Sequence, residues 1–467
     1  MKVAVEGCCH GELDATYRYL AELEKKNGYT VNLLVITGDF QAVRNYLDLE
    51  CMSVPVKYRR EGDFQAYYNG VKVAPVPTIV IGGNHEASNY MWELYHGGWL
   101  APNIYYLGAA GCVQVNGLRI AGSSGIYNEP HYRSGHYETV PYNSGSLRSA
   151  YHTREYDVLK LSMLTRPDIF LSHDWPQGIA HHGNLQGLLR KKSFFKADID
   201  SGRLGSPPMM SLLRKLQPKF WFASHLHVKF EATVNHAASQ GASLPDLVQQ
   251  AAVEANPDEI VLDDFDDTAA PAPSDQPAST GTTSHSANPD EITIDDEEFD
   301  TSAPADLTPQ FSSAPAPDRP ISPSLERYTK FLALDKCLPK RSFLEVQDIR
   351  TPVPINGSTG PVLTFDPEWL AISRALHPFL STSRAGLPLP SEETARGLVQ
   401  RELDWVTANL GAQELKDVQE FVQTAPSPIQ KNKNLRQPQW YTNPQTVSFC
   451  NLIGVENKVN PPPPAAN

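Results

Sequence analysis

The chain opens with Met1-Lys2-Val3-Ala4-Val5-Glu6-Gly7-Cys8-Cys9-His10, an apolar run that leads directly into a glycine, two cysteines and a histidine. Short apolar runs bounded by turn residues are typical of buried strands. The pattern recurs over residues 1 to about 235, and we expect strands at Val3 to Val5, Leu33 to Ile36, Thr78 to Ile81, Leu118 to Ala121, Asp168 to Leu171 and Phe220 to Ala223. Strands that alternate with helical or loop stretches predict an α/β layered fold.

A polar cluster follows nearly every predicted strand. The clusters are Gly7-Cys8-Cys9-His10, Gly38-Asp39, Gly83-Asn84-His85, Ser172-His173-Asp174 and Ser224-His225-Leu226-His227. Sites in open α/β sheets form beyond the carboxyl ends of the strands, so these clusters should meet at one rim. A lone histidine is more often structural than a ligand, and Gly-Asp pairs are common in turns. Five clusters in this order nevertheless favour a single site for metal ions.

The net charge of −13 is unevenly distributed. Between His236 and Pro323 there are 18 acidic residues and one basic residue, Arg319, so this segment carries −17 and the remainder of the chain +4. The segment is poor in large apolar residues and cannot bury enough surface to offset its chain entropy. We therefore expect residues 236–323 to be a disordered acidic linker. A mildly basic body is compatible with a polyanionic substrate.

The acidic segment contains a short repeat. Ala255-Asn256-Pro257-Asp258-Glu259-Ile260 recurs at residues 287–292, and each copy is followed by an aliphatic residue and a run of acids. One interpretation is a solubilising spacer with a chance duplication, and the other is a pair of docking motifs for a protein partner.

The sequence after the acidic segment predicts a second folded region. Phe331 to Leu334 suits a buried helical turn or strand, Asp366 and Pro367 are typical of a helix start, and Ser391 opens a further helix that should stop at Gly411. The expected units are a catalytic domain over 1–235, the linker over 236–323, a smaller C-terminal domain over 324–424 and a mostly disordered tail over 425–467.

Length, apolar runs and cysteine content indicate the compartment in which we expect the protein. With 467 residues the chain should form two or three units, and it has no run of about 18 apolar residues that could span a membrane. The N-terminus lacks the apolar run and cleavage site of a secretory signal. Six cysteines in a chain this long are typical of a reducing compartment, and we expect an intracellular protein.

The order of the clusters resembles the motif pattern of the calcineurin-like metallophosphoesterases, a β-sandwich flanked by helices. That family normally reads Asp-x-His, Gly-Asp, Gly-Asn-His-Asp/Glu, a lone His and Gly-His-x-His. The resemblance implies that Cys8, His10 and His227 bind one metal, that Asn84, His173 and His225 bind another, and that Asp39 lies between them. It further implies that His85 binds neither metal and instead protonates the leaving oxygen.

Two positions depart from this pattern. Cys8 stands where the family usually has Asp, and Ser224 stands where it usually has Gly. A thiolate is a softer ligand than a carboxylate and favours Zn²⁺ or Fe²⁺ over Mg²⁺. The expected cofactor is a divalent metal, Fe²⁺ together with Zn²⁺ or Mn²⁺, as one or two ions.

The cysteine at position 8 also indicates which members of this family the chain resembles most. Val5 to Asp14, Ile81 to Glu86, Leu171 to Pro176 and Ser224 to Phe230 resemble the lariat debranching enzymes, and so do Thr329 to Pro339 and Phe365 to Ala371. The resemblance implies a branched lariat intron RNA as partner, hydrolysis of its 2′,5′-phosphodiester by metal-activated water, and a nuclear location.

A stretch rich in aromatic and basic residues extends from Tyr127 to Tyr156. Aromatic stacking and arginine contacts commonly hold flexible RNA, and in the family this region resembles the loop that recognises the lariat. The expected RNA contacts are Tyr127, His131, Tyr132, Arg133, Tyr137, Arg148, Tyr151 and Arg154. The alternative is a polar loop packed by its own tyrosines. The run Arg190-Lys191-Lys192 suits phosphate contacts and a solvated helix end equally well.

Two other functions stay open at this point. A protein phosphatase or small-molecule phosphodiesterase of the same fold is disfavoured, because the Asp-Arg pair that phosphoprotein phosphatases place shortly after Gly-Asp is absent from Gly38 to Arg44. A non-catalytic adaptor would normally have lost ligands, whereas every ligand position here holds a residue able to bind metal.

Overall fold

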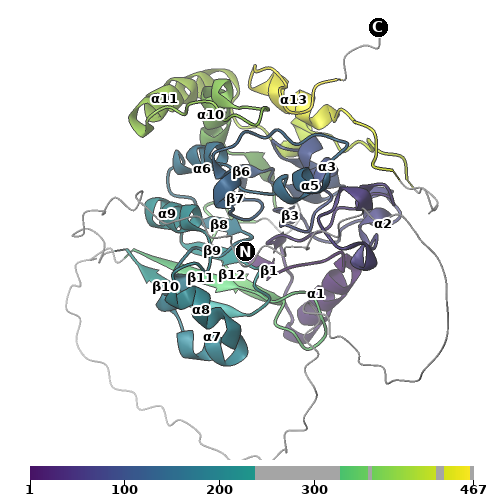
Figure 1. Ribbon diagram of the computed structural model, residues 1–467, viewed down its shortest axis with the longest axis vertical. Coiled ribbons are helices and arrows are strands. Elements are labelled where there is room, and N and C mark those ends of the chain that lie inside the picture. The colour runs from purple at the N-terminus through teal and green to yellow at the C-terminus, as the bar shows by residue number, and fades with distance from the viewer. Residues whose placement is uncertain (237–326, 356–359, 428–435, 463–467) are drawn as a thin grey trace, which may run out of the picture. The chain divides into compact units, whose positions relative to one another are not determined.

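The computed structural model describes residues 1–236, 327–355, 360–427 and 436–462 (Figure 1). Two mixed sheets form its centre. The first has six strands in the order β12 (Leu344–Asp348), β1 (Lys2–Glu6), β2 (Leu33–Ile36), β3 (Thr78–Val80), β5 (Ile104–Tyr106) and β4 (Gly98–Ala101). The second has seven, in the order β10 (Phe230–Asn235), β11 (Tyr328–Ala333), β9 (Phe220–Ala223), β8 (Ile169–Ser172), β7 (Leu118–Ser123), β6 (Ala110–Val115) and β13 (Leu363–Phe365).

All six predicted strands are confirmed, as β1, β2, β3, β7, β8 and β9. The side chains on both faces of these strands are buried, and this explains why each strand is encoded by a continuous apolar run. Val5, Val35 and Ile79 of the first sheet pack with Ile120, Leu171 and Phe222 of the second in one core between the sheets. This arrangement is the predicted sandwich.

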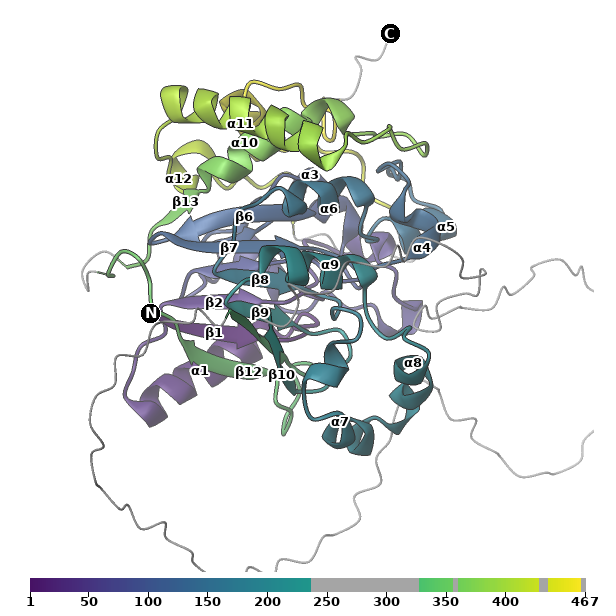
Figure 2. The same cartoon turned by 90° about the vertical axis from the view of Figure 1, so that its left-hand side faces the viewer.

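Helices cover the two outer faces (Figure 2). Leu13, Tyr17 and Leu20 of α1 pack on the outer side of the first sheet, and Leu161 of α6 and Leu213 of α9 pack on that of the second. The helices are α1 (Leu13–Asn27), α2 (Phe64–Tyr68), α3 (Ser88–Glu93), α4 (Glu129–Tyr132), α5 (Ser144–Ser149), α6 (Glu155–Ser162), α7 (Leu185–Lys191), α8 (Lys196–Asp200), α9 (Pro207–Leu216), α10 (Pro367–Leu376), α11 (Glu392–Asn409), α12 (Leu415–Val418) and α13 (Pro444–Leu452).

The region after residue 327 completes both sheets. β12 pairs antiparallel with β1, β11 lies between β10 and β9, and β13 pairs antiparallel with β6. Phe331 to Leu334, for which the sequence left helix or strand open, is therefore largely strand. The boundary expected at residue 324 does not separate two independently packed domains, because strands from the later region are integral to the sandwich.

The helix starts expected in this region are confirmed. The Asp366 side chain accepts a hydrogen bond from the Trp369 backbone N–H at 3.1 Å, and Pro367 is the first residue of α10. Ser391 accepts from the Thr394 N–H at 3.2 Å at the start of α11. Gly411 follows the end of α11 with a φ of 61°, a conformation that favours glycine.

The expectation of a mostly disordered tail is wrong for residues 436–462. This segment contains α13, whose Phe449 is 1% exposed and stacks on His96 with ring centroids 5.0 Å apart. Ile453 is also buried, in the core between the sheets. The polar sequence hid the segment because only a few apolar residues anchor it.

The predicted disordered linker lies, apart from His236, outside the described residues, as do both copies of the repeat at 255–260 and 287–292. No helix in the described part of the chain has the length and apolar character needed to cross a membrane.

Candidate metal centre

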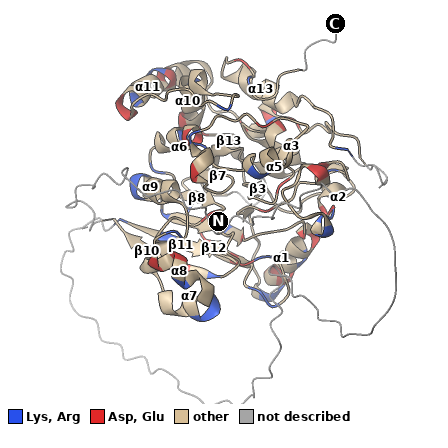
Figure 3. Ribbon diagram, viewed as in Figure 1, with Lys and Arg blue, Asp and Glu red and all other residues tan. Residues whose placement is uncertain are grey.

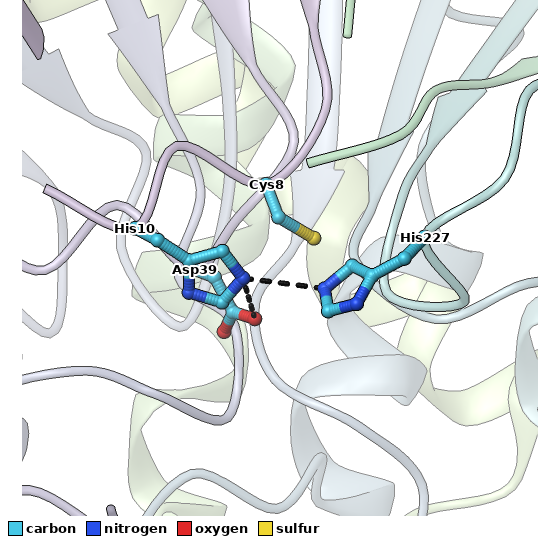
Figure 4. Close-up of side chains that lie close together, drawn as sticks. All are labelled: Cys8, His10, Asp39 and His227. Carbon is cyan, nitrogen blue, oxygen red and sulfur yellow. Dashed lines mark hydrogen bonds and ion pairs between the residues drawn. The ribbon is translucent and has the colours of Figure 1, made fainter. Parts of the chain in front are cut away.

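The loops that follow β1, β2 and β9 bring Cys8, His10, Asp39 and His227 together (Figure 4). One ligand atom of each residue lies within 4.8 Å of the corresponding atoms of the others. His10 Nε2 is 3.2 Å from His227 Nε2 and 3.7 Å from Asp39 Oδ2. The carboxyl ends of strands from both sheets thus meet at one rim, as the sequence predicts.

These four side chains fit a divalent cation. Two nitrogens bound to a tetrahedral Zn²⁺ lie about 3.3–3.4 Å apart, close to the separation of the two imidazoles. Burial lowers the pKa of His10 to about 4 and the pKa of His227 to about 2, so both rings are neutral at pH 7 and keep a lone pair for a metal. A donor set of sulfur, two nitrogens and an oxygen suits Zn²⁺ or Fe²⁺.

A second group lies on the other side of the Asp39 carboxylate. His173 Nε2 is 3.4 Å from Asp39 Oδ1 and 3.1 Å from Asn84 Oδ1. The ring of His225 lies 4.9 Å from the His173 ring, centroid to centroid. Burial acts to raise the pKa of Asp39, but His173 and His85 outweigh it and hold that pKa well below its usual range. The ionised carboxylate therefore lies between the two groups of predicted ligands.

A hydrogen bond to the backbone fixes the orientation of the His173 ring. Its Nδ1 donates to the Thr37 carbonyl at 2.9 Å, so Nε2 faces Asp39. The Ser224 hydroxyl donates to the same carbonyl at 2.7 Å and lies 3.1 Å from Nδ1. Ser224, where the family pattern has glycine, thus helps to hold a predicted ligand in place.

The backbone around the centre is both crowded and strained. A Cβ at Gly38 would lie 2.2 Å from His173 Nδ1, and a Cβ at Gly83 would lie 2.2 Å from Asp39 Oδ1. Only glycine fits at these two motif positions. Four predicted ligands have left-handed φ values that non-glycine residues seldom adopt, namely His10 (49°), Asp39 (46°), His225 (62°) and His227 (48°). Strain of this kind clusters at functional sites.

Glu86 is a residue that the sequence analysis did not assign. Its carboxylate accepts backbone hydrogen bonds from Phe40 and Gln41 at 2.8 Å and from Gly83 at 2.9 Å. It thereby joins the loop after β2 to the loop after β3. Burial and the nearby Asp39 raise the pKa of Glu86 to about 7. The sequence signal that could have identified Glu86 was its place in the motif Gly83-Asn84-His85-Glu86.

His85 lies at the edge of the centre. Its backbone N–H donates to Asp39 Oδ1 at 2.9 Å, and its Nδ1 is 3.8 Å from Asp39 Oδ2. The side chain is 23% exposed, whereas that of His173 is fully buried. His85 is therefore near the predicted ligands and accessible to a substrate.

The stretch from Tyr127 to Tyr156, which we call the aromatic loop, borders the His173 side of the centre. The Tyr127 N–H donates to Oδ2 of Asp174, the residue after His173, at 3.2 Å. Its tyrosines pack partly on the loop itself: the Tyr127 and Tyr132 rings are 5.5 Å apart, and Tyr137 Oη is 3.2 Å from Ser149 Oγ. Arg133 is exposed, and the half-buried members of the predicted RNA set are Tyr127, His131, Tyr132, Tyr137, Arg148 and Tyr151.

Arg154 is placed differently from the prediction. It is 0% exposed, and its guanidinium donates to Glu138 Oε1 at 2.6 Å and to the carbonyls of His131 and Ser149 at 3.0 Å. Arg154 therefore holds the loop together from inside and offers no group to RNA. Sequence could not reveal this because the partner carboxylate is 16 residues away.

Comparison with known proteins covers nearly the whole chain. Residues 1–229 match the calcineurin-like phosphoesterase family, and residues 326–458 match the C-terminal domain of lariat debranching enzymes. The chain is 45% identical to the lariat debranching enzyme of Schizosaccharomyces pombe, with 100% of this chain and 99% of the relative covered. It is 39% identical to the Arabidopsis thaliana enzyme (97% and 86% covered) and 40% identical to the Homo sapiens enzyme (97% and 69% covered).

Proposed function

Since the chain belongs to the lariat debranching enzyme family, we propose that it hydrolyses the 2′,5′-phosphodiester at the branch point of excised intron lariat RNA. The product is a linear intron RNA that carries a 5′-phosphate and has a free 2′-hydroxyl at the former branch point. The observation that carries this proposal is the convergence of Cys8, His10, Asp39 and His227, in a chain that matches the family over nearly its full length.

Cys8, His10, Asp39 and His227 would hold one cation, and Asn84, His173 and His225 would hold a second, with Asp39 shared. Divalent cations at such a site stabilise the negative charge of a phosphate and activate water. The protein contributes the orientation of these ligands through Thr37, Ser224 and Glu86.

His85 is the proposed general acid. The 2′-oxygen of the branch nucleotide leaves as its bond to phosphorus breaks, and it takes a proton from the His85 ring. Water supplies the oxygen that replaces it on phosphorus. Asp39 positions His85 by accepting its backbone N–H and by lying 3.8 Å from its Nδ1.

The proposed metals are Fe²⁺ together with Zn²⁺ or Mn²⁺, as one or two ions. The soft thiol of Cys8 favours Zn²⁺ or Fe²⁺ at the site that it shares with His10 and His227. Elemental analysis of the purified protein, followed by chelation and return of one metal at a time, tests this. Cys8→Asp should keep a metal site but shift its preference from Zn²⁺ towards Mn²⁺. An unchanged preference would remove the thiol from the metal site.

A branched 2′,5′ RNA and a phosphopeptide, assayed side by side, test the reaction. We expect cleavage of the RNA alone. Cleavage of the phosphopeptide alone would favour the phosphatase alternative, and a protein that takes up no Mn²⁺, Fe²⁺ or Zn²⁺ would favour the adaptor.

Two expectations about the cell extend this proposal. A nuclear location follows from the substrate, and imaging of the tagged chain tests it. Docking of a protein partner on the repeats at 255–260 and 287–292 is tested by deletion of both copies. An unchanged set of co-purifying proteins would leave only the spacer interpretation.

A further inference from the structure

The loop between β11 and β12, residues 334–343, lies against the Cys8 side of the metal centre. The Cys337 N–H donates to the Cys8 carbonyl at 2.9 Å, and Lys336 forms a parallel bridge with Cys8. A Cβ at Gly7 would lie only 2.1 Å from the Asp335 carbonyl oxygen. The backbone of this loop therefore lies next to the residues that border the site where the phosphate must bind.

Positive charge gathers at this border. Lys336, Lys340 and Arg341 belong to the loop, and Lys192 follows the last residue of α7. Figures 1 and 2 both show the loop beside α7, and Figure 3 shows the basic end of that helix. Burial lowers the pKa of Lys192. The negative charge of Asp335 opposes this shift, and the positive charges of Arg341 and Lys336 add to it. The charge of Lys336 also reaches His10 and His227.

Carboxylates balance little of this charge. Within the described ranges the ammonium groups of Lys192, Lys336 and Lys340 have no ion pair, and Arg341 has one, to Asp335 at 3.3 Å. Acidic residues of the neighbouring α8 already have partners of their own, since Asp198 pairs with Arg203 and Asp200 with Lys196. The cations are thus available to an anion from outside.

An exposed aromatic ring accompanies the cations. Phe194 is 58% exposed and its ring centroid lies 5.6 Å from Lys192 Nζ, whereas the adjacent Phe195 is buried. A large exposed phenyl ring among lysines is the combination on which single-stranded nucleic acid binds, with bases stacked on the ring and phosphates next to the cations.

We propose that Lys192, Phe194, Lys336, Lys340 and Arg341 form a second RNA-contact surface that holds one single-stranded arm of the branched substrate. The aromatic loop borders the His173 side of the centre, and this basic surface borders the Cys8 side. A branched RNA has three arms that leave one nucleotide, so contacts on two sides of the centre suit it. The inference rests on the proposed debranching function.

The test compares two substrates: a branched RNA with three arms of about ten nucleotides and a minimal branched RNA with one nucleotide per arm. The variants are the triple K192Q/K340Q/R341Q and, separately, Phe194→Ala. The control K25Q/K26Q/R401Q removes three positive charges, all exposed, from α1 and α11. Lys336 is kept because it forms a backbone bridge with Cys8, a predicted metal ligand.

The triple variant should raise KM for the long-armed RNA roughly tenfold at 150 mM salt and leave kcat within about twofold. The slope of log(kcat/KM) against log[salt] should become shallower by about 2, since each lost contact with single-stranded phosphate contributes about 0.7. Phe194→Ala should raise the same KM roughly fivefold without changing the slope, because it removes stacking and no charge. Values for the minimal RNA, and for the control variant, should stay at the wild-type level.

The proposed RNA-contact surface would be overturned by two results together. The triple variant would keep the wild-type KM and salt slope on the long-armed RNA, and Phe194→Ala would leave KM unchanged. Equal losses on the two substrates would also overturn it, since the charges would then act on the centre itself. A wild-type chain that cleaves neither substrate would overturn the debranching function, a result distinct from either of these.

Discussion

His85 is the residue whose role is most sharply testable, because it is close to the predicted ligands yet 23% exposed. His85→Ala should retain metal and branched RNA binding and lose turnover by roughly 10²–10⁴, the usual contribution of a general acid. Single-turnover cleavage, elemental analysis and RNA binding measure the three quantities. His181→Ala, at an exposed position of a 3-10 helix (Ile179–His182), is the matched control. Loss of metal from His85→Ala would show that His85 is a ligand.

Lys160 gives a prediction about pH at the same scale. Its ammonium is buried, 4.6 Å from the centroid of the Trp369 ring, and burial lowers its pKa from 10.5 to about 8 although Asp157 opposes the shift. Between pH 8 and 10.5 the unfolded chain binds the proton more tightly than the folded chain, so the stability due to this residue rises with pH in that window. Below pH 8 the full cost of burying the charge is present.

Lys160→Met should therefore stabilise the protein at pH 8, and its advantage over wild type should shrink by about 3 kcal/mol as pH rises to 10.5. Chemical denaturation of both proteins at several pH values in this window measures the difference. An advantage that is constant with pH would mean that the folded protein holds the Lys160 proton as tightly as the unfolded chain does, so that burial does not lower its pKa.

At the scale of elements, Asp366 joins α10 to the second sheet. It caps the helix and accepts two hydrogen bonds from Arg119 of β7, at 2.7 and 2.9 Å. Asp366→Ala should lower the free energy of unfolding by about 2–4 kcal/mol, because it removes the cap and leaves a largely buried arginine short of a partner. Ser391→Ala, which removes only the exposed cap of α11, should cost about 1 kcal/mol. Denaturation midpoints that shift equally in the two variants would contradict the role of the ion pair.

At the scale of the whole molecule, the acidic segment joins two adjacent strands. Asn235 of β10 is paired with Tyr328 of β11, and the His236 N–H donates to the Arg327 carbonyl at 2.8 Å. Asn-Gly in place of residues 237–326 should therefore form a two-residue hairpin turn. Each halving of a loop recovers about 0.6 kcal/mol, so the stability should rise by up to about 3 kcal/mol.

The shortened protein should keep its metal content, and its kcat on the minimal branched RNA should stay within about threefold of wild type. Denaturation, elemental analysis and the cleavage assay check this. Loss of folding on deletion would show that the segment contributes to the sandwich, contrary to the pairing of β10 with β11.

The sequence by itself determined the parts of this protein that depend on short-range patterns. Buried strands need continuous apolar runs, helix starts need a capping side chain, and the Gly38-Asp39 and Gly83-Asn84 pairs need glycine where no Cβ fits. These local requirements were enough to predict six strands, two helix starts and a meeting of the clusters at one rim.

Only the tertiary structure decided what depends on partners far along the chain. β12 pairs with β1 across more than 300 residues, Arg154 is buried because Glu138 faces it, and α13 folds because Phe449 stacks on His96. Their own segments carry little trace of these contacts, since the stabilising free energy comes from a surface that exists only after the sandwich has formed. For the same reason the basic loop beside Cys8 is recognisable as a surface only once β11 has taken its place in the sheet.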